Sequence, residues 1–250
     1  MSPYQAVEVS TEGPVGVLRL CRPELHNRFD EVVFSEIGLA LAGLEADTSV
    51  RAVVFASTGR TFSAGGDTET MLAANADLQV MLAQIDEGRR LFRAFADFTK
   101  PLIAALHGHV FGVATSLVLT ADAVVSAPGV KIADPHVHMG LVAGDGGCVT
   151  WPASLPLVRA KRHLLWGEPL LAEDADAVGP LAVELASQVA ALPPVAVQLT
   201  KRALNKVLGS RIDDVFDTAF YLEAISISTA DLREAVAAFK EKRPGRWSGR

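Results

Sequence analysis

Short apolar runs rich in β-branched residues recur along the chain, and each is bounded by glycine, proline, serine or charged residues. They lie at residues 15–20, 51–56, 102–106 and 123–126. Runs of this length and composition are typical of buried strands. We therefore expect four strands that lie in the interior of a sheet.

Helical spacing appears between these runs. Val33, Ile37, Leu41 and Leu44 repeat every three or four residues after Asp30, a residue type that commonly caps a helix N-terminus. Residues 68–98 carry a similar period up to the break before Pro101, and residues 113–121 form a short apolar stretch. The order predicts an α/β fold built from repeated strand–strand–helix units.

Strand patterns stop near residue 193, and the rest of the chain is composed of helix formers. We expect two regions, a core over residues 1–192 and a helical region over residues 193–250. The predicted helices have more apolar surface than one subunit can cover, which favours packing on another subunit. Packing within the same chain is the alternative.

Composition excludes several classes of protein. The net charge of −6 argues against nucleic-acid binding, which requires clustered lysine and arginine. The apolar runs are shorter than the ~20 residues of a membrane-spanning helix, and the N-terminus has no secretory pattern. Two distant cysteines, Cys21 and Cys148, indicate neither a disulfide framework nor a zinc site. We expect a cytoplasmic protein.

Two glycine-containing turns hold the first candidate chemistry. Residues 61–68 (TFSAGGDT) and 107–116 (HGHVFGVATS) each follow a predicted strand and precede a predicted helix. Gly65 and Gly66 let the backbone approach a ligand closely, and Val113 stands at a predicted helix start, where free N–H groups favour negative charge. One amide from each turn would form an oxyanion hole for a thioester enolate. Either turn alone is also compatible with a purely structural role.

Three segments resemble motifs of the crotonase (enoyl-CoA hydratase/isomerase) superfamily. TFSAGGD resembles its FxAGAD segment, HGHVFGVATSL its NGxxxGGGxEL segment, and ADPHVHMGLVAGDGG its FGxPExxxGxxPGxGG segment. The resemblance implies a ββα spiral core, a C-terminal helical region that forms trimers or dimers of trimers, and coenzyme A (CoA) thioester substrates of fatty acid metabolism without another cofactor. It also implies that the amides of Ala64 and Val113 are the oxyanion donors.

The resemblance further implies where CoA binds. The implied contacts are Glu24, Leu25, His26, the turn Ala64, Gly65, Gly66 and Asp67, and, near the adenine and phosphates of a neighbouring subunit's ligand, Phe239 and Lys242. Solvation of Lys242 alone is the alternative. Near Gly179 and Pro180 the family has a further strand and loop, so either this chain is shortened there or the sequence omits a segment.

The two glutamates of family hydratases are replaced. They fall on Ser116 and His136. A serine hydroxyl does not ionise at neutral pH, whereas an imidazole with a pKa near 6.5 exchanges protons there. His136 is therefore the candidate acid/base, and we expect hydration of crotonyl-CoA to be weak or absent because the paired carboxylates are missing. A hydrogen-bonded histidine without a catalytic role is the alternative.

Asp145 lies nine residues after His136, in the sequence AGDGG. Its glycine neighbours would let the chain turn this carboxylate toward His136, although a simple loop residue is the alternative. A His/Asp pair at this spacing partly resembles crotonase-fold hydrolases that cleave carbon–carbon bonds of cyclic β-diketones without CoA. A third reading is a non-catalytic acyl-CoA binder, which would have no need of His136 or Asp145. None of the other histidines is predicted to bind a metal.

Overall fold

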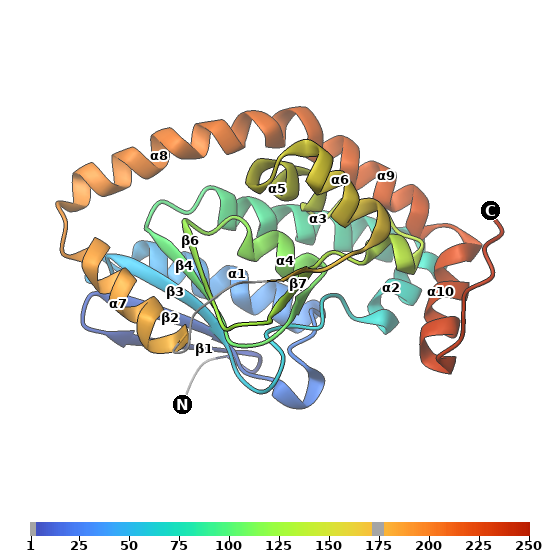
Figure 1. The fold of residues 1–250 in the computed structure, drawn as a ribbon, viewed down its shortest axis with the longest axis horizontal. Coiled ribbons are helices and arrows are strands. Elements are labelled where there is room, and N and C mark those ends of the chain that lie inside the picture. Colours follow the sequence, from blue (N-terminus) through green and yellow to red (C-terminus); the bar gives the residue numbers. More distant parts are fainter. Residues whose placement is uncertain (1–3, 172–177) are drawn as a thin grey trace.

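The computed structural model describes residues 4–171 and 178–250, and its centre is a five-stranded sheet (Figure 1). Its strands lie in the order β1 (Val7–Glu12), β2 (Val15–Leu20), β3 (Ala52–Ser57), β4 (Leu102–Leu106) and β6 (Ala123–Ser126). Strand β1 pairs antiparallel with β2, and all other neighbours are parallel. The four strands expected from the apolar runs are present, β3 shifted by one residue. Strand β1 was not predicted, because it is a half-exposed edge strand and has no continuous apolar run.

Helices cover both faces of this sheet. Helix α1 (Glu31–Ala46) packs its apolar face against one side, and the expected cap is confirmed because Asp30 accepts a hydrogen bond from the Val33 amide at 3.1 Å. Helix α7 (Val178–Ala190) covers the opposite face, where small residues such as Ala182 and Ala186 allow close approach to the strands. The sheet is therefore buried on both sides, which explains the unbroken apolar character of its strands.

The predicted single helix over residues 68–98 is two helices, α2 (Thr68–Ala76) and α3 (Leu78–Ala96). Asp77 separates them, and its side chain accepts hydrogen bonds from the Gln79 and Val80 amides at the start of α3. The apolar period continues across the break, which is why the sequence pattern did not show it.

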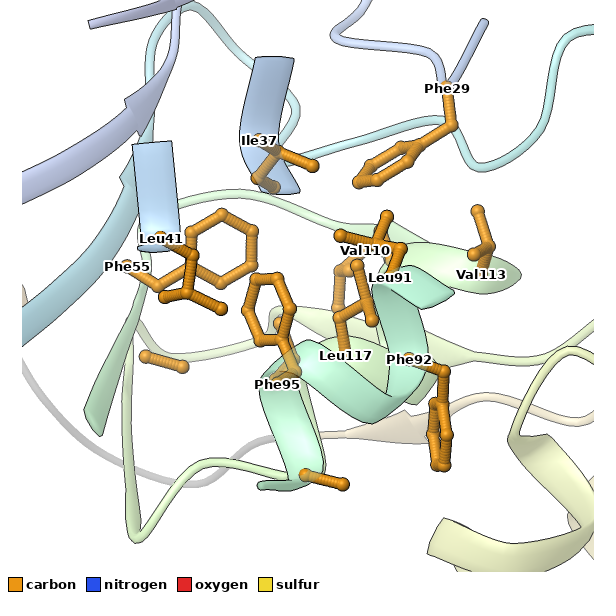
Figure 2. Packing of buried hydrophobic residues seen from close by; sticks show 14 of the residues in the cluster. Phe29, Ile37, Leu41, Phe55, Leu91, Phe92, Phe95, Val110, Val113 and Leu117 are labelled. Atoms are coloured by element: carbon orange, nitrogen blue, oxygen red, sulfur yellow. The ribbon is translucent and has the colours of Figure 1, made fainter. Parts of the chain in front are cut away.

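A second, three-stranded sheet brings the two glycine turns together. Strand β7 (Lys131–Ala133) lies between β5 (Val110–Phe111) and β8 (Leu170–Leu171), and Ser63 of the first turn forms a bridge with Val110. The short helix α4 (Val113–Val118) begins directly after β5 and is fully buried, as expected. Figure 2 shows Val113 and Leu117 of α4 beside Leu91 and Phe92 of α3 in the core.

The remaining elements are helical. They are the 3₁₀ turns Pro23–Leu25 and His136–Met139, the helices α5 (Gly147–Ser154), α6 (Leu157–Trp166), α8 (Pro194–Arg211), α9 (Asp217–Ile227) and α10 (Ala230–Glu241), and a π-helical turn over Ile212–Phe216. Helix α8 runs along one border of the molecule in Figure 1, and α10 lies near the C-terminus. Phe216 and Phe220 are buried in the main core, so part of the helical region packs within its own chain.

Three further expectations concern the boundary near residue 193, the segment near Gly179 and membrane-spanning helices. The boundary at residue 193 remains a prediction. Gly179 and Pro180 lie in α7, but residues 172–177 just before them are outside the described part of the chain, so the question of a shortened segment stays open. Among the described residues no single helix is long and apolar enough to cross a membrane, while the bent pair Gly179–Ala190 and Pro194–Ile227 reaches that length and composition only together.

Candidate active site

Two cavities meet beside the glycine turns. The larger, here named the outer cavity, has a volume of about 570 Å³ and is lined by residues of both turns, of the 3₁₀ turn Pro23–Leu25 and of α10. The smaller, here named the inner cavity, has a volume of about 100 Å³ and lies among α1, α3, α4 and α9. Gly66, Asp67, Met71, His136 and Leu141 line both cavities, so one ligand can occupy both.

The outer cavity gathers nearly all residues that the sequence assigned to CoA. Its walls include Glu24, Leu25, His26, Ala64, Gly65, Gly66, Asp67 and Phe239. Lys242 is not among the lining residues; it is exposed at the C-cap of α10. Phe239 reaches the cavity of its own chain, whereas we had expected it beside a neighbouring subunit's ligand.

The two turns are in direct contact where the cavities meet. Gly65 has a φ of +87°, and a Cβ placed on it would lie 3.6 Å from the Gly112 Cα. A Cβ on Gly112 would lie 4.0 Å from the Gly66 nitrogen and 3.7 Å from His136 Cε1. A Cβ on Gly65 would also lie 2.9 Å from the Phe111 carbonyl oxygen, and Gly112 has a φ of +56°, so both positions favour glycine.

The backbone amides of the turns differ in availability. The Ala64 N–H donates to the His26 carbonyl at 3.0 Å, and the Gly65 N–H donates to Ser63 Oγ at 3.1 Å. Within residues 4–171 and 178–250, no protein acceptor takes the N–H of Gly66 or of Val113. The free pair is therefore Gly66 and Val113, and the expectation that Ala64 is a free donor does not fit this geometry.

His136 is buried and held at both ring nitrogens. Its Nδ1 contacts Asp134 Oδ1, and its Nε2 lies 3.2 Å from Asp145 Oδ2 and 3.7 Å from Glu223 Oε1. Ser116 donates a hydrogen bond to Asp145 Oδ1 at 3.1 Å. The expected approach of Asp145 to His136 is present. Asp134 and Glu223 also lie near the ring, so the cluster consists of His136 and three carboxyl side chains.

The cluster holds protons more tightly than isolated side chains would. Burial alone would lower the pKa of His136, but the carboxylates of Asp134 and Asp145 outweigh it and raise that pKa well above its usual range. Burial, reinforced by the charge of Asp145, raises the pKa of Glu223 well above its usual range. Both shifts favour the protonated forms of His136 and Glu223.

Glycines of the loop before α5 make room for this cluster. A Cβ on Gly144 would lie 2.7 Å from Glu223 Oε2 and would also clash with the Ala219 carbonyl. A Cβ on Gly147 would clash with Asp134 Oδ2. These two carboxylate oxygens have no hydrogen-bond partner among the described residues. The loop therefore packs its backbone directly against these two carboxyl groups.

The neighbouring thiol is not a candidate nucleophile. Burial, with a contribution from Asp134, raises the pKa of Cys148 to about 11. The reactive species of cysteine is the thiolate, which this environment disfavours.

The cluster also contains three residues of types that bind metal ions, Asp134, His136 and Asp145. One potential ligand atom from each lies within 4.8 Å of the others. Both imidazole nitrogens, however, face carboxylates, which is the arrangement of a salt-bridged imidazolium. The ion pairs account for the cluster, and a site without metal remains our prediction.

Two members of the cluster were missed by the sequence analysis. Asp134 directly follows the short strand β7 and precedes His136 by two residues. Polar side chains in such loop positions are commonly functional. Glu223 stands within the apolar stretch AFYLEAISI of α9, and a lone carboxyl on a buried helix face was the available signal. Its proximity to His136 depends on tertiary packing.

Known proteins resemble this chain over nearly its whole length. The sequence model described as enoyl-CoA hydratase/isomerase matches residues 10–250. The chain belongs to the enoyl-CoA hydratase/isomerase family. Among family members, it is 29% identical to 2,3-dehydroadipyl-CoA hydratase of Escherichia coli, covering 97% of this chain and 98% of the relative. It is 28% identical to 1,2-epoxyphenylacetyl-CoA isomerase of the same organism, covering 96% and 97%.

Solved structures of the enoyl-CoA hydratase/isomerase family share the fold. A family member from Mycobacterium paratuberculosis superposes with a TM-score of 0.90 at 32% identity, covering 94% of this chain and 99% of that one. The expected crotonase fold, with its C-terminal helices, is thereby confirmed.

Proposed function

We propose that this protein is an acyl-CoA enzyme that transfers protons at the α-carbon of a thioester through a bound enolate. Support comes mainly from one observation, the pair of unoccupied amides of Gly66 and Val113 beside His136 where the two cavities meet. The outer cavity would hold CoA and the inner cavity the acyl group. Family membership supports an acyl-CoA substrate.

The proposed reaction begins with removal of an α-proton. The electron pair of the broken C–H bond moves into the thioester carbonyl, whose oxygen then accepts hydrogen bonds from Gly66 and Val113. The raised pKa of His136 favours its protonated form, which is unsuited to take this proton. We assign the base to Asp145, with Ser116 and His136 as positioning residues.

Glu223 is proposed as the acid that returns a proton to the carbon chain. It lines the inner cavity and lies next to His136, and burial raises its pKa well above the usual range, which favours the protonated form. The expectation of weak crotonyl-CoA hydration assumed a single titratable group. Because Asp145 and Glu223 accompany His136, a base and an acid are both available, and we withdraw that expectation. Isomerisation and hydration both use these steps.

Deuterium exchange tests enolate formation without knowledge of the natural substrate. Butyryl-CoA incubated with the enzyme in D₂O should gain α-deuterium, measured by mass spectrometry. The Asp145→Asn variant should exchange about 10²–10⁴-fold more slowly because the base is lost. The exposed Asp86→Asn on α3 is the matched control and should exchange normally. Binding of butyryl-CoA without any exchange, or normal exchange by Asp145→Asn, would refute the mechanism.

A carbon–carbon bond hydrolase is the second candidate, favoured by the 3.2 Å approach of Asp145 to His136 Nε2. In that reaction water would attack a ring carbonyl of a cyclic β-diketone, and the leaving enolate would occupy the same amides. Cleavage of 2-alkyl-1,3-cyclohexanediones in the absence of CoA, followed by NMR, would favour this reading. A non-catalytic binder is disfavoured because His136 and Asp145 both line the inner cavity.

A further inference from the structure

The inner cavity has an unbalanced charge lining. Five carboxyl side chains line it, those of Glu31, Asp67, Glu87, Asp145 and Glu223. No lysine or arginine within residues 4–171 and 178–250 lines it, and His136 is its one potentially cationic side chain. The acidic character therefore exceeds what the proposed chemistry requires.

Three of these carboxyl groups are already accounted for. Asp67 pairs with Arg28 at 3.2 Å, and Asp145 lies against His136. Glu223 is buried with a pKa raised well above its usual range, and its Oε2 has no hydrogen-bond partner among the described residues. The imidazolium has no free ring nitrogen, since Asp134 holds the other one. No cation remains for a charged end of an acyl group.

Glu31 and Glu87 are the two carboxyl groups without an ion-pair partner among the described residues. Glu31 is the first residue of α1 and is exposed at the edge of the cavity, and Glu87 is half-buried on α3. Neither forms an ion pair with any described residue. Burial raises the pKa of Glu87; Arg90 partly opposes this, and the nearby charge of Glu31 adds to it. A further negative charge in this region would meet both burial and like-charge repulsion.

The rest of the inner cavity is apolar and small. Four phenylalanines, Phe29, Phe34, Phe92 and Phe220, belong to its walls. Figure 2 shows Phe29 near Val113, at the edge of the buried cluster that also contains Phe92. Its volume of about 100 Å³ equals the bulk-liquid volume of roughly three water molecules, which suits a short acyl group.

We propose that the inner cavity selects a short, uncharged acyl group and rejects acyl groups that end in a carboxylate, with Glu31 and Glu87 as the discriminating residues. This inference rests on the proposed function, which assigns the inner cavity to the acyl group. It separates this chain from its 29% identical relative, the 2,3-dehydroadipyl-CoA hydratase, whose acyl group ends in a carboxylate.

Butyryl-CoA and succinyl-CoA provide a matched test, because both acyl groups have four carbons and only one ends in a carboxylate. Isothermal titration calorimetry at pH 7.5 should give at least about tenfold tighter binding of butyryl-CoA, since like charges brought together in a binding site are costly. The double variant Glu31→Gln/Glu87→Gln should reduce this ratio several-fold. The single variant Asp86→Asn, next to Glu87 on the exposed side of α3, is the control and should leave the ratio unchanged.

The binding results distinguish a failure of the proposed selectivity from a failure of the proposed function. If neither thioester nor CoA itself binds, the proposed function fails. If both thioesters bind equally, or succinyl-CoA binds more tightly, the selectivity is absent and the inference is overturned. A preference for butyryl-CoA that persists fully in the double variant would also overturn it, because the discrimination would then lie outside Glu31 and Glu87.

Discussion

At the scale of single residues, the proposed chemistry depends on the pKa values of His136 and Glu223. Burial alone would lower the pKa of the His136 imidazole, but the carboxylates on either side raise it. Burial raises the pKa of the Glu223 carboxyl, so both groups bind their protons more tightly than usual. His136 retains its proton as a cation in an ion pair, and Glu223 retains its own because ionisation would leave a buried charge. Neighbouring groups with such different environments are typical of acid/base sites.

These two groups predict how stability depends on pH. Each binds its proton more tightly in the folded state, so the folded chain carries more protons than the unfolded chain above the ordinary pKa of each group. The free energy of unfolding should therefore fall as the pH rises, from about 4.3 upward for Glu223 and from about 6.5 upward for His136, until each folded-state pKa is passed. Urea denaturation at several pH values measures this slope.

Glu223→Gln is the variant that isolates the carboxyl contribution, because it keeps the shape and removes the ionisable group. It should flatten the pH dependence of stability and lower α-exchange or turnover by about 10²–10⁴-fold, while thioester binding is retained. An unchanged activity in this variant would remove Glu223 from the mechanism, leaving His136 as the proton donor.

At the scale of elements, a glycine loop sets the distance between the core and α9. Gly144 has no room for a side chain, because the Ala219 carbonyl and Glu223 lie against it. The loop that carries Asp145 and the helix that carries Glu223 are therefore packed backbone to backbone. The two proposed proton-transfer groups depend on this contact for their positions.

Gly144→Ala tests that contact. We expect it to lower the free energy of unfolding by about 1–3 kcal/mol through overpacking and to reduce activity by displacing Glu223. Gly43→Ala on α1 is the matched control, because a Cβ there meets no atom within 4 Å and alanine is the better helix former. Chemical denaturation and the exchange assay report the two effects, and a fully active, stable Gly144→Ala protein would contradict the proposed packing.

At the scale of the whole molecule, helices α8 and α9 leave many large apolar side chains exposed. On α8 these are Val195, Leu199, Leu204 and Val207, and on α9 Tyr221, Leu222 and Ile225, each at least 49% exposed. Apolar surface of this extent on a globular protein usually marks an interface. Although Phe216 and Phe220 are covered by their own chain, these residues are not, so subunit packing remains our proposal.

We predict a trimer or a dimer of trimers formed through this surface. Light scattering coupled to size-exclusion chromatography should give three or six times the mass of one chain at micromolar concentration. Leu199→Glu/Val207→Glu should shift the mass toward the monomer, because charges would be buried at the contact. Arg202→Glu is the control. Arg202 lies on the same helix and lines a separate cleft with Asp97 and Asp213, so this variant changes a charge outside the apolar surface. A wild-type monomer would contradict the prediction.

The sequence by itself determined four strands of the main sheet, the first helix with its Asp30 cap, and the two glycine turns, because these follow from local apolar runs, capping chemistry and glycine content. It also placed most residues of the outer cavity through ordered motifs. The break at Asp77, the engagement of the Ala64 amide by His26, and the meeting of Asp134 and Glu223 at His136 were decided only by the tertiary structure. Those features depend on which groups far apart in the sequence become neighbours, and on the burial that then changes their pKa values.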